Sequence, residues 1–146
     1  MFKFKMQSVL DYRRNVEEKI LGDYSDLKRR HAEEKGILKQ LVGSRRQALH
    51  ALRGTGNRVM NVSDIAESIA YIESIRSQEE RQKGVIRQVK ALVEAKHREL
   101  MEAVKNRKVM EKLKERHEYE YRKEMSELEQ KNSDEMSVLK FGRRQT

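Results

Sequence analysis

The 146-residue chain has no cysteine, no proline and no tryptophan. Without cysteine it has neither disulfide bonds nor cysteine-ligated zinc sites, which is compatible with a reducing cytosol. It has no apolar run of about 18 residues that could span a membrane. The opening MFKFKM also lacks the apolar core of a secretory signal peptide. We therefore expect a cytoplasmic protein.

Charged residues make up 39% of the chain, against about 25% in an average globular domain. Hydrophobic residues, at 36%, are still too many and too regularly spaced for a disordered chain. An elongated coiled coil accommodates both values, because its narrow apolar seam leaves broad charged faces. The net charge of +9 favours an acidic partner, which can be a protein surface, a membrane or nucleic acid.

A first helix is predicted over about residues 6–52, from apolar residues at helical 3-4 spacing. This ladder consists of Met6, Leu10, Ile20, Tyr24, Leu27, His31, Leu38, Leu41, Ala48 and Leu52. It is interrupted at Arg13, Glu17, Glu34 and Arg45. Glycines then predict a loop over 53–60.

A second, longer helix is predicted over about residues 61–139, followed by a disordered tail at 142–146. Asn61 is its expected N-cap, with Ser63 as the alternative. Asp64 lies in its first turn, and Met60 and Ile65 have the spacing of a hydrophobic staple. Its seam is expected to contain Ile65, Ile69, Ile72, Ile86, Val93, Leu100 and Val104. We expect residues 1–146 to form a single domain.

A short loop makes two helices antiparallel, so the predicted fold is an all-α, two-helix coiled-coil hairpin with a longer second helix. Folding about residue 57 places Met6 near Lys108. Residues 109–139 then have no helix of this chain opposite them, although they keep apolar residues. The apolar face of this overhang consists of Met110, Leu113, Tyr121, Met125 and Leu128. Such a face can fray, form a homodimer or bind another protein.

No catalytic motif is present, and the lone pair Glu94 and His97 lacks the second pair that a di-iron bundle requires. We predict no enzyme, cofactor, metal or small-molecule ligand. At the hairpin tip, no acidic residue occurs between Glu34 and Asp64, while Tyr71 and Ile75 are predicted beside the seam. Such a basic tip is either a solvated end of the hairpin or a docking surface for an acidic protein segment. The candidate tip residues are Arg45, Arg46, Leu49, Arg53, Tyr71 and Ile75.

A second basic zone covers the far end, with glutamates alternating among its cations. Pairs such as Glu118 and Arg122 are explained first as support within the helix. The basic residues of the zone are Lys105, Arg107, Lys108, Lys112, Lys114, Arg116, Arg122 and Lys123. A coiled-coil arm that binds nucleic acid is the alternative, but the interleaved acids favour a protein partner.

Two segments at the ends of the chain, Phe2–Glu18 (FKFKMQSVLDYRRNVEE) and Asn106–Arg144, carry a recognisable pattern. Its residues are Phe4, Gln7, Leu10, Glu17 and Glu18, then Arg107, Lys108, the run Glu111–Arg116, Glu129–Lys131, Asp134, Glu135 and Phe141. In these residues the chain resembles the flagellar export protein family FliJ. The centre, Gly36 to Gln82, matches poorly.

The resemblance implies a cytoplasmic, non-enzymatic part of the flagellar type III export apparatus, peripheral at the inner face of the cell membrane through its partners. The helix-terminus end would insert into the hexameric export ATPase and promote its assembly and activity. The tip would touch the membrane-embedded export gate, and export chaperones would bind as well. The expected ATPase-binding residues are Phe4, Gln7, Arg107, Lys108, Met110, Lys112, Leu113, Lys114, Arg116, Tyr121 and Met125.

Overall fold

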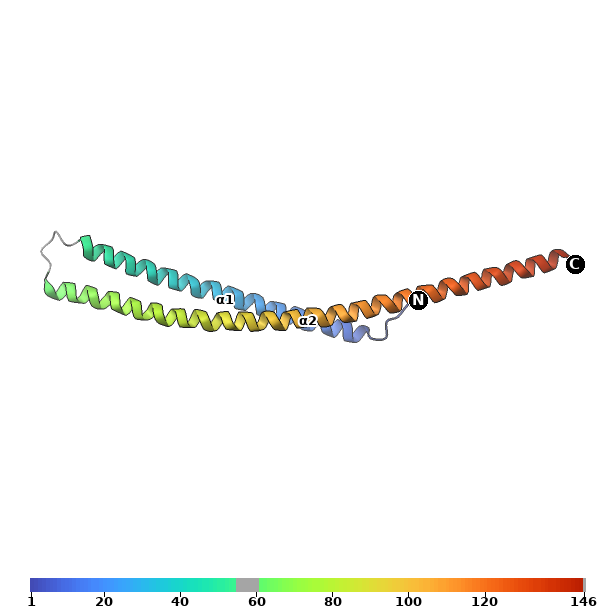
Figure 1. Cartoon of the computed structure of the whole chain (residues 1–146), viewed down its shortest axis with the longest axis horizontal. Helices are drawn as coiled ribbons and strands as arrows, with labels where there is room; N and C mark the ends of the chain where they lie inside the picture. Colours follow the sequence, from blue (N-terminus) through green and yellow to red (C-terminus); the bar gives the residue numbers. More distant parts are fainter. Residues whose placement is uncertain (55–60, 146) are drawn as a thin grey trace. The chain divides into compact units, whose positions relative to one another are not determined.

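The computed structural model describes residues 1–54 and 61–145, without the side chain of Gln145. Its regular structure in these ranges is helical: α1 spans Gln7–Gly54 and α2 spans Val62–Gln145. The helices pack against each other in opposite directions, and α2 is much the longer (Figure 1). The predicted antiparallel hairpin with a longer second helix is confirmed.

The helix ends differ from the predicted ones at the end of α1 and at the end of α2. Arg53 and Gly54 belong to α1, and residues 55–60, with the Met60 end of the staple, lie outside the described residues. The Asn61 carbonyl accepts hydrogen bonds from the amides of Asp64 (3.0 Å) and Ile65 (3.2 Å), as expected at a helix N-terminus. The tail prediction is wrong for residues 142–145, because α2 remains helical to Gln145.

In each helix, one series of buried and half-buried positions alternates in steps of three and four residues, the pattern of a coiled coil. In α1 they are Leu10, Arg13, Glu17, Ile20, Tyr24, Leu27, His31, Glu34, Leu38, Leu41, Arg45, Ala48 and Leu52. In α2 they are Ile72, Ile75, Glu79, Gln82, Ile86, Val89, Val93, Lys96, Leu100, Ala103, Arg107, Met110 and Lys114. The four interruptions of the predicted ladder therefore occupy seam positions.

The predicted α2 seam needs correction near the tip. Ile65 and Ile69 keep 37% and 45% of their surface exposed, although both were expected in the seam. Ile75, expected beside the seam, is only 4% exposed. The regular 3-4 spacing that runs from Ile72 through Ile75 and Glu79 explains the difference, because it places Ile75 directly between the helices.

Contacts divide the chain into two compact units. The terminal unit contains Met1–Glu18 and Met101–Thr146, and the central unit contains Lys19–Leu100. The terminal unit has a core of Phe4, Leu10 and Met110, against which Phe2, Val9 and Leu113 pack. The single domain stays a prediction.

The central unit combines aliphatic packing with polar pairs. Arg45 donates to the Glu79 carboxylate at 2.7 Å, and Gln82 donates to the Glu34 backbone carbonyl at 2.9 Å. The centroids of the Tyr24 and His97 rings lie 5.6 Å apart. Neither helix, over its described residues, has a segment long and apolar enough to cross a membrane.

Candidate interaction surfaces

The segment before α1 lies along α2 in the terminal unit. The amino group of Met1 donates to the Tyr121 hydroxyl at 3.0 Å, and the Phe2 ring lies 5.5 Å from the Tyr121 ring. Phe4 meets His117 edge to face, with 5.7 Å between ring centroids. These contacts correct the predicted register, in which Met6 lies near Lys108 and the unmatched part of α2 begins at residue 109.

The chain itself therefore covers part of the face that we predicted to be open. Phe4 and Met110 are buried, at 8% and 9% exposure, and Leu113 and Tyr121 are half-buried. Gln7 is also half-buried and donates to Asp11 at 2.9 Å. Of the apolar residues proposed for ATPase binding, Met125, at 41% exposure, keeps the largest accessible fraction.

Arg107, another proposed ATPase contact, is held inside the terminal unit by carboxylates. It pairs with Glu17 across the helices and with Glu111 one turn along α2, at 2.8 Å. Arg14 lies 3.5 Å from the second oxygen of Glu111. Hydrogen bonds to Glu17 and then Glu111 raise the pKa of Arg107, and the bond from Arg107 lowers the pKa of Glu111. This network links α1 and α2.

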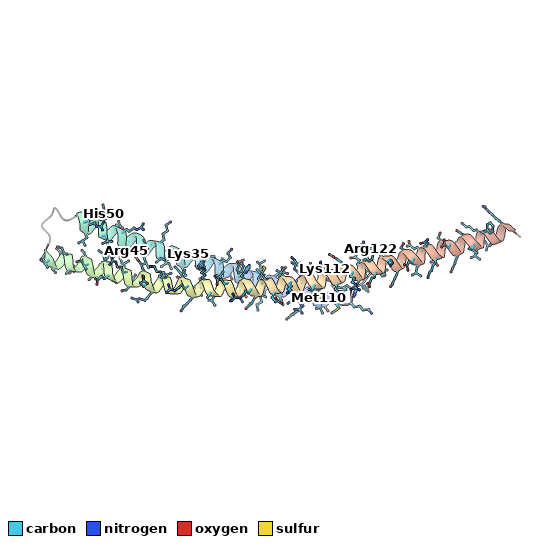
Figure 2. All side chains as sticks on the ribbon, viewed as in Figure 1. Lys35, Arg45, His50, Met110, Lys112 and Arg122 are labelled. Atoms are coloured by element: carbon cyan, nitrogen blue, oxygen red, sulfur yellow. The ribbon has the colours of Figure 1, made fainter. Side chains whose placement is uncertain are left out.

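The other predicted cations of the far end are more accessible. Lys108, Lys112 and Arg116 are exposed, whereas Lys114 is half-buried at a seam position. Arg116 pairs with Glu120 at 3.3 Å and Arg122 with Glu118 at 3.0 Å, each one turn apart. The expected Glu118–Arg122 support is thus confirmed. Figure 2 marks Lys112 and Arg122 on α2.

Beyond Tyr121, α2 continues without cover. Every described side chain from Arg122 to Arg144 is exposed. We name residues 122–145 the α2 extension. Its exposed large apolar residues are Met125, Leu128, Met136, Val138, Leu139 and Phe141. An isolated helix gains little from exposed apolar side chains, so this surface is available to a partner.

At the tip, the structure separates the six predicted residues into different environments. Arg45 is bound to the buried Glu79, Ile75 is buried, and Leu49 is half-buried. Arg46, Arg53 and Tyr71 are exposed, Tyr71 at 57%. The predicted surface is therefore reduced to two arginines and one tyrosine that a partner can reach fully.

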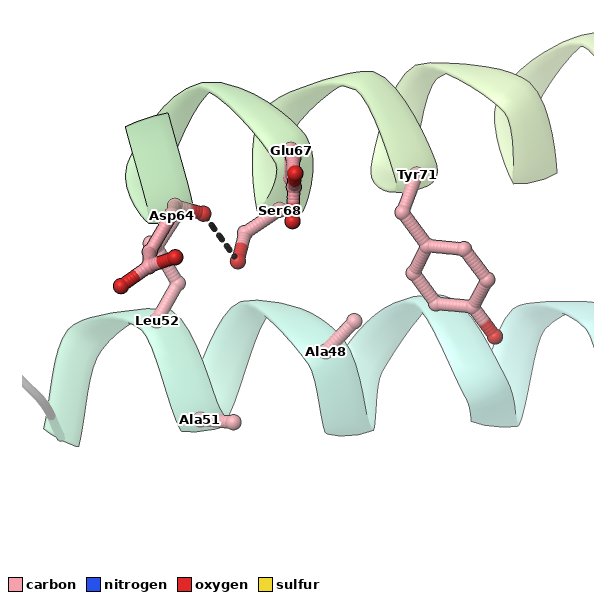
Figure 3. Close-up of a pocket in the computed structure, with 7 residues that line it drawn as sticks. All are labelled: Ala48, Ala51, Leu52, Asp64, Glu67, Ser68 and Tyr71. Carbon is pink, nitrogen blue, oxygen red and sulfur yellow. Dashed lines mark hydrogen bonds between the residues drawn. The ribbon is translucent and has the colours of Figure 1, made fainter. Parts of the chain in front are cut away.

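An open groove near the tip was missed by the sequence analysis (Figure 3). Small side chains on α1 leave space opposite Tyr71, whose side chain extends from α2 toward α1. Ser68 donates to the Asp64 carbonyl at 3.0 Å within it. The lining residues are Ala48, Ala51, Leu52, Asp64, Glu67, Ser68 and Tyr71. The pair Ala48 and Ala51 was the available signal, since alanines at a helix contact leave room between backbones.

The Glu94–His97 pair has a structural explanation. The His97 ring packs on Tyr24, and Glu94 is exposed. Among the described residues, no three histidine, cysteine, aspartate or glutamate side chains are grouped so that they could hold a metal ion.

Comparison with known proteins identifies the family of this hairpin. The family model described as Flagellar FliJ protein matches residues 2–146. The chain belongs to the FliJ family. It is therefore a component of flagellar type III export, from a family of non-catalytic proteins.

A solved structure shares the fold of this FliJ-family chain. It is a putative YscO homolog, CT670, from Chlamydia trachomatis, with 22% sequence identity and a TM-score of 0.51. The alignment covers 95% of this chain and 94% of that chain, so the hairpin fold is common to both over almost their full lengths. No curated protein matches the chain.

Proposed function

We propose that this FliJ-family chain is a stalk of the flagellar export ATPase. In this proposal the terminal unit enters the central hole of the hexameric ATPase and promotes ring assembly and turnover. The tip meets the cytoplasmic part of the membrane-embedded export gate, and export chaperones bind on the tip side. The chain is then held at the inner face of the cell membrane through its partners.

The observation that carries this proposal is the uncovered α2 extension. Its described side chains from Arg122 to Arg144 are all exposed. Met125, Leu128 and Leu139 lie on one side of the helix, because offsets of 3, 11 and 14 residues return to nearly the same direction. A ring that closes around this side would bury an apolar stripe that the hairpin leaves in water.

The exposed lysines of the terminal unit also support ATPase binding by this unit. Lys108, Lys112 and Lys123 are exposed and form no ion pair or hydrogen bond among the described residues. An acidic pore lining would attract them before apolar contacts form, since complementary charge raises the rate of association. In the central unit, Tyr71 and the exposed Arg46 and Arg53 offer a separate surface for the gate.

The test is the turnover and ring assembly of the purified cognate export ATPase with and without the chain. A truncation after Lys123 removes almost all of the α2 extension and none of the Phe4, Leu10 and Met110 core. We expect the full chain to stimulate turnover and promote rings, and the truncation to lose both effects. Equal stimulation by the truncation would show that the extension is not the ATPase contact.

A full-length variant separates the apolar stripe from chain length. Met125→Ser with Leu128→Ser removes two exposed apolar side chains from the stripe and should reduce the stimulation. Phe141→Ser is the matched control, because Phe141 is 65% exposed and lies on the other side of the helix. The proposal predicts that this control stimulates the ATPase like the natural chain.

A further inference from the structure

One face of α2 in the terminal unit combines lysines with exposed apolar side chains. Met101 and Val109 are 47% and 61% exposed, and Val104 is half-buried beside them. Together with Lys105, Lys108 and Lys112 they line a shallow groove, which we name the basic strip. All six residues come from α2, so the groove has no second wall.

The lysines of the basic strip are unpaired. Lys105, Lys108 and Lys112 are exposed, and none makes an ion pair or hydrogen bond among the described residues. Of the nearby carboxylates on α2, Glu111 is bound by Arg107 and Arg14. Glu102 and Glu115 are exposed three residues from Lys105 and Lys112, but neither forms an ion pair among the described residues. The strip therefore presents three unpaired lysines along about 10 Å of helix, with these two glutamates beside it.

We propose that the basic strip binds the anionic phospholipid surface of the membrane directly. The ammonium groups would lie among the lipid phosphates, while Met101, Val104 and Val109 would enter the boundary between headgroups and acyl chains. The stalk proposal assigns Lys108 and Lys112 to the ATPase as well, so one copy of the chain makes either the lipid contact or the ATPase contact through these lysines.

Two features favour a lipid surface over an apolar helix and over nucleic acid, and the poly-L-glutamate comparison below tests an acidic protein. A third helix packing at the 3-4 spacing of Met101, Lys105, Lys108 and Lys112 would cover three lysines, and burying unpaired charges is costly. A lipid surface leaves the ammonium groups hydrated. On nucleic acid, the lysines could reach phosphates, but Met101 and Val109 would have no apolar surface to contact and no aromatic ring of the strip could stack on a base.

The experiment is flotation of the full chain with vesicles of phosphatidylcholine, with or without phosphatidylglycerol. We expect binding to the phosphatidylglycerol vesicles only, weakening as salt screens the charges. Each lysine near an anionic surface changes affinity about fivefold, so Lys105→Gln, Lys108→Gln and Lys112→Gln together should reduce binding roughly 100-fold. Val109→Gln should reduce it several-fold, including at high salt.

A charge-matched control separates the strip from net charge. Lys19, Lys35 and Lys39 are exposed on α1 and unpaired among the described residues, so their triple glutamine variant loses the same charge elsewhere. It should keep binding within a few-fold of the natural chain. Circular dichroism checks that all variants remain helical, and Lys108→Glu provides a single-site test, expected to weaken binding more than tenfold.

Three results would overturn the proposal. The first is equal binding to vesicles with and without phosphatidylglycerol. The second is an equal loss in the two lysine triples, which would assign the effect to net charge. The third is tighter, strip-dependent binding to poly-L-glutamate or to duplex DNA than to vesicles, which would assign the strip to an acidic protein or to nucleic acid.

Discussion

Charged side chains occupy seam positions that most coiled coils fill with aliphatic residues, and at Glu79 the charge is well buried. The Glu79 side chain is 8% exposed and its partner Arg45 is 24% exposed. Glu79→Ala would leave the Arg45 guanidinium against the seam without its carboxylate. We expect this change to lower the free energy of unfolding by about 2–3 kcal/mol, less than for a fully buried pair. Urea unfolding measures it.

The aliphatic replacement of both partners is the control for the Arg45–Glu79 pair. Arg45→Leu with Glu79→Leu removes both charges and restores an apolar seam layer. The urea concentration at its unfolding midpoint should therefore be at least as high as that of the natural chain. If the double variant is as unstable as Glu79→Ala, the ion pair stabilises the hairpin outright rather than serving mainly to specify the register.

Glu111 makes the stability of the terminal unit depend on acid pH. The hydrogen bond from Arg107 lowers the pKa of this carboxyl from its ordinary value of 4.5. A group whose pKa is lower in the folded state stabilises that state when ionised, and this contribution is lost as the pH falls from about 4.5 through the folded pKa. The melting temperature of Glu111→Gln should therefore fall less between pH 5 and pH 3, roughly, than that of the natural chain.

Melting temperatures of Glu111→Gln and the natural chain at neutral pH check whether Glu111 contributes to the acid sensitivity. Glu111→Gln should melt somewhat below the natural chain at pH 7, and the two curves should converge in acid. Parallel curves throughout would show that the Arg107–Glu111 pair does not contribute to the acid sensitivity. Glu115→Gln is a suitable control, because Glu115 is exposed on the same helix and makes no ion pair among the described residues.

The periodicity of the sequence was enough to locate most seam positions but not their pairing. Arg13, Glu17, Glu34 and Arg45 were recognised as breaks in the apolar ladder, and the structure places all four in the seam. The partners of Glu17, Glu34 and Arg45 are Arg107, Gln82 and Glu79, which are far away in the sequence, so local spacing cannot identify them. Ile75 was misplaced because the predicted seam was phased on Ile65 and Ile69, which are 37% and 45% exposed in the structure.

At the scale of the elements, the segment before α1 acts as the last part of the helix pairing. Phe4 is 8% exposed and packs with Leu10 and Met110. Phe4→Ala should lower the free energy of unfolding by about 3 kcal/mol, at the low end for a buried phenylalanine because the site lies near a chain end. Phe141→Ala, at 65% exposure, should change it by less than about 0.5 kcal/mol.

Thermal or urea unfolding of both phenylalanine variants decides whether this segment is a stabilising element. Equal stability of the two would mean that the Phe4 contact does not persist in solution. A loss of stability confined to Phe4→Ala would show that the segment before α1 stabilises the hairpin through its contact with Leu10 and Met110.

The α2 extension should contribute helix but little stability. All its described side chains are exposed, so the truncation after Lys123 removes no buried contact. We expect its free energy of unfolding to remain within about 0.5 kcal/mol of that of the natural chain, while the helical ellipticity decreases. A large loss of stability would show that the extension packs on the hairpin or on a second copy of the chain.

The register between the helices was the part of the fold that the sequence predicted least well. Symmetric folding about residue 57 placed Met6 near Lys108, whereas packing brings Leu10 to Met110 and Phe4 to His117. A turn midpoint fixes register only to within about a turn of helix, and the apolar and aromatic pairs then select one alignment. The α-helical pattern and the order of the elements depend on local spacing, which explains why these were predicted correctly.

At the scale of the molecule, the proposed stalk has two separable ends, and Tyr71 tests the tip. Tyr71 is 57% exposed beside the tip groove. Tyr71→Ala should therefore keep the free energy of unfolding within about 0.5 kcal/mol of that of the natural chain and leave ATPase stimulation unchanged. If Tyr71 is a central gate contact, its loss should cost about 2 kcal/mol of gate affinity, roughly 30-fold, and reduce flagellar export in cells. Tyr12→Ala, at 64% exposure in the terminal unit, is the control for the gate affinity. Loss of both ATPase stimulation and export in Tyr71→Ala would show that the two ends do not act separately.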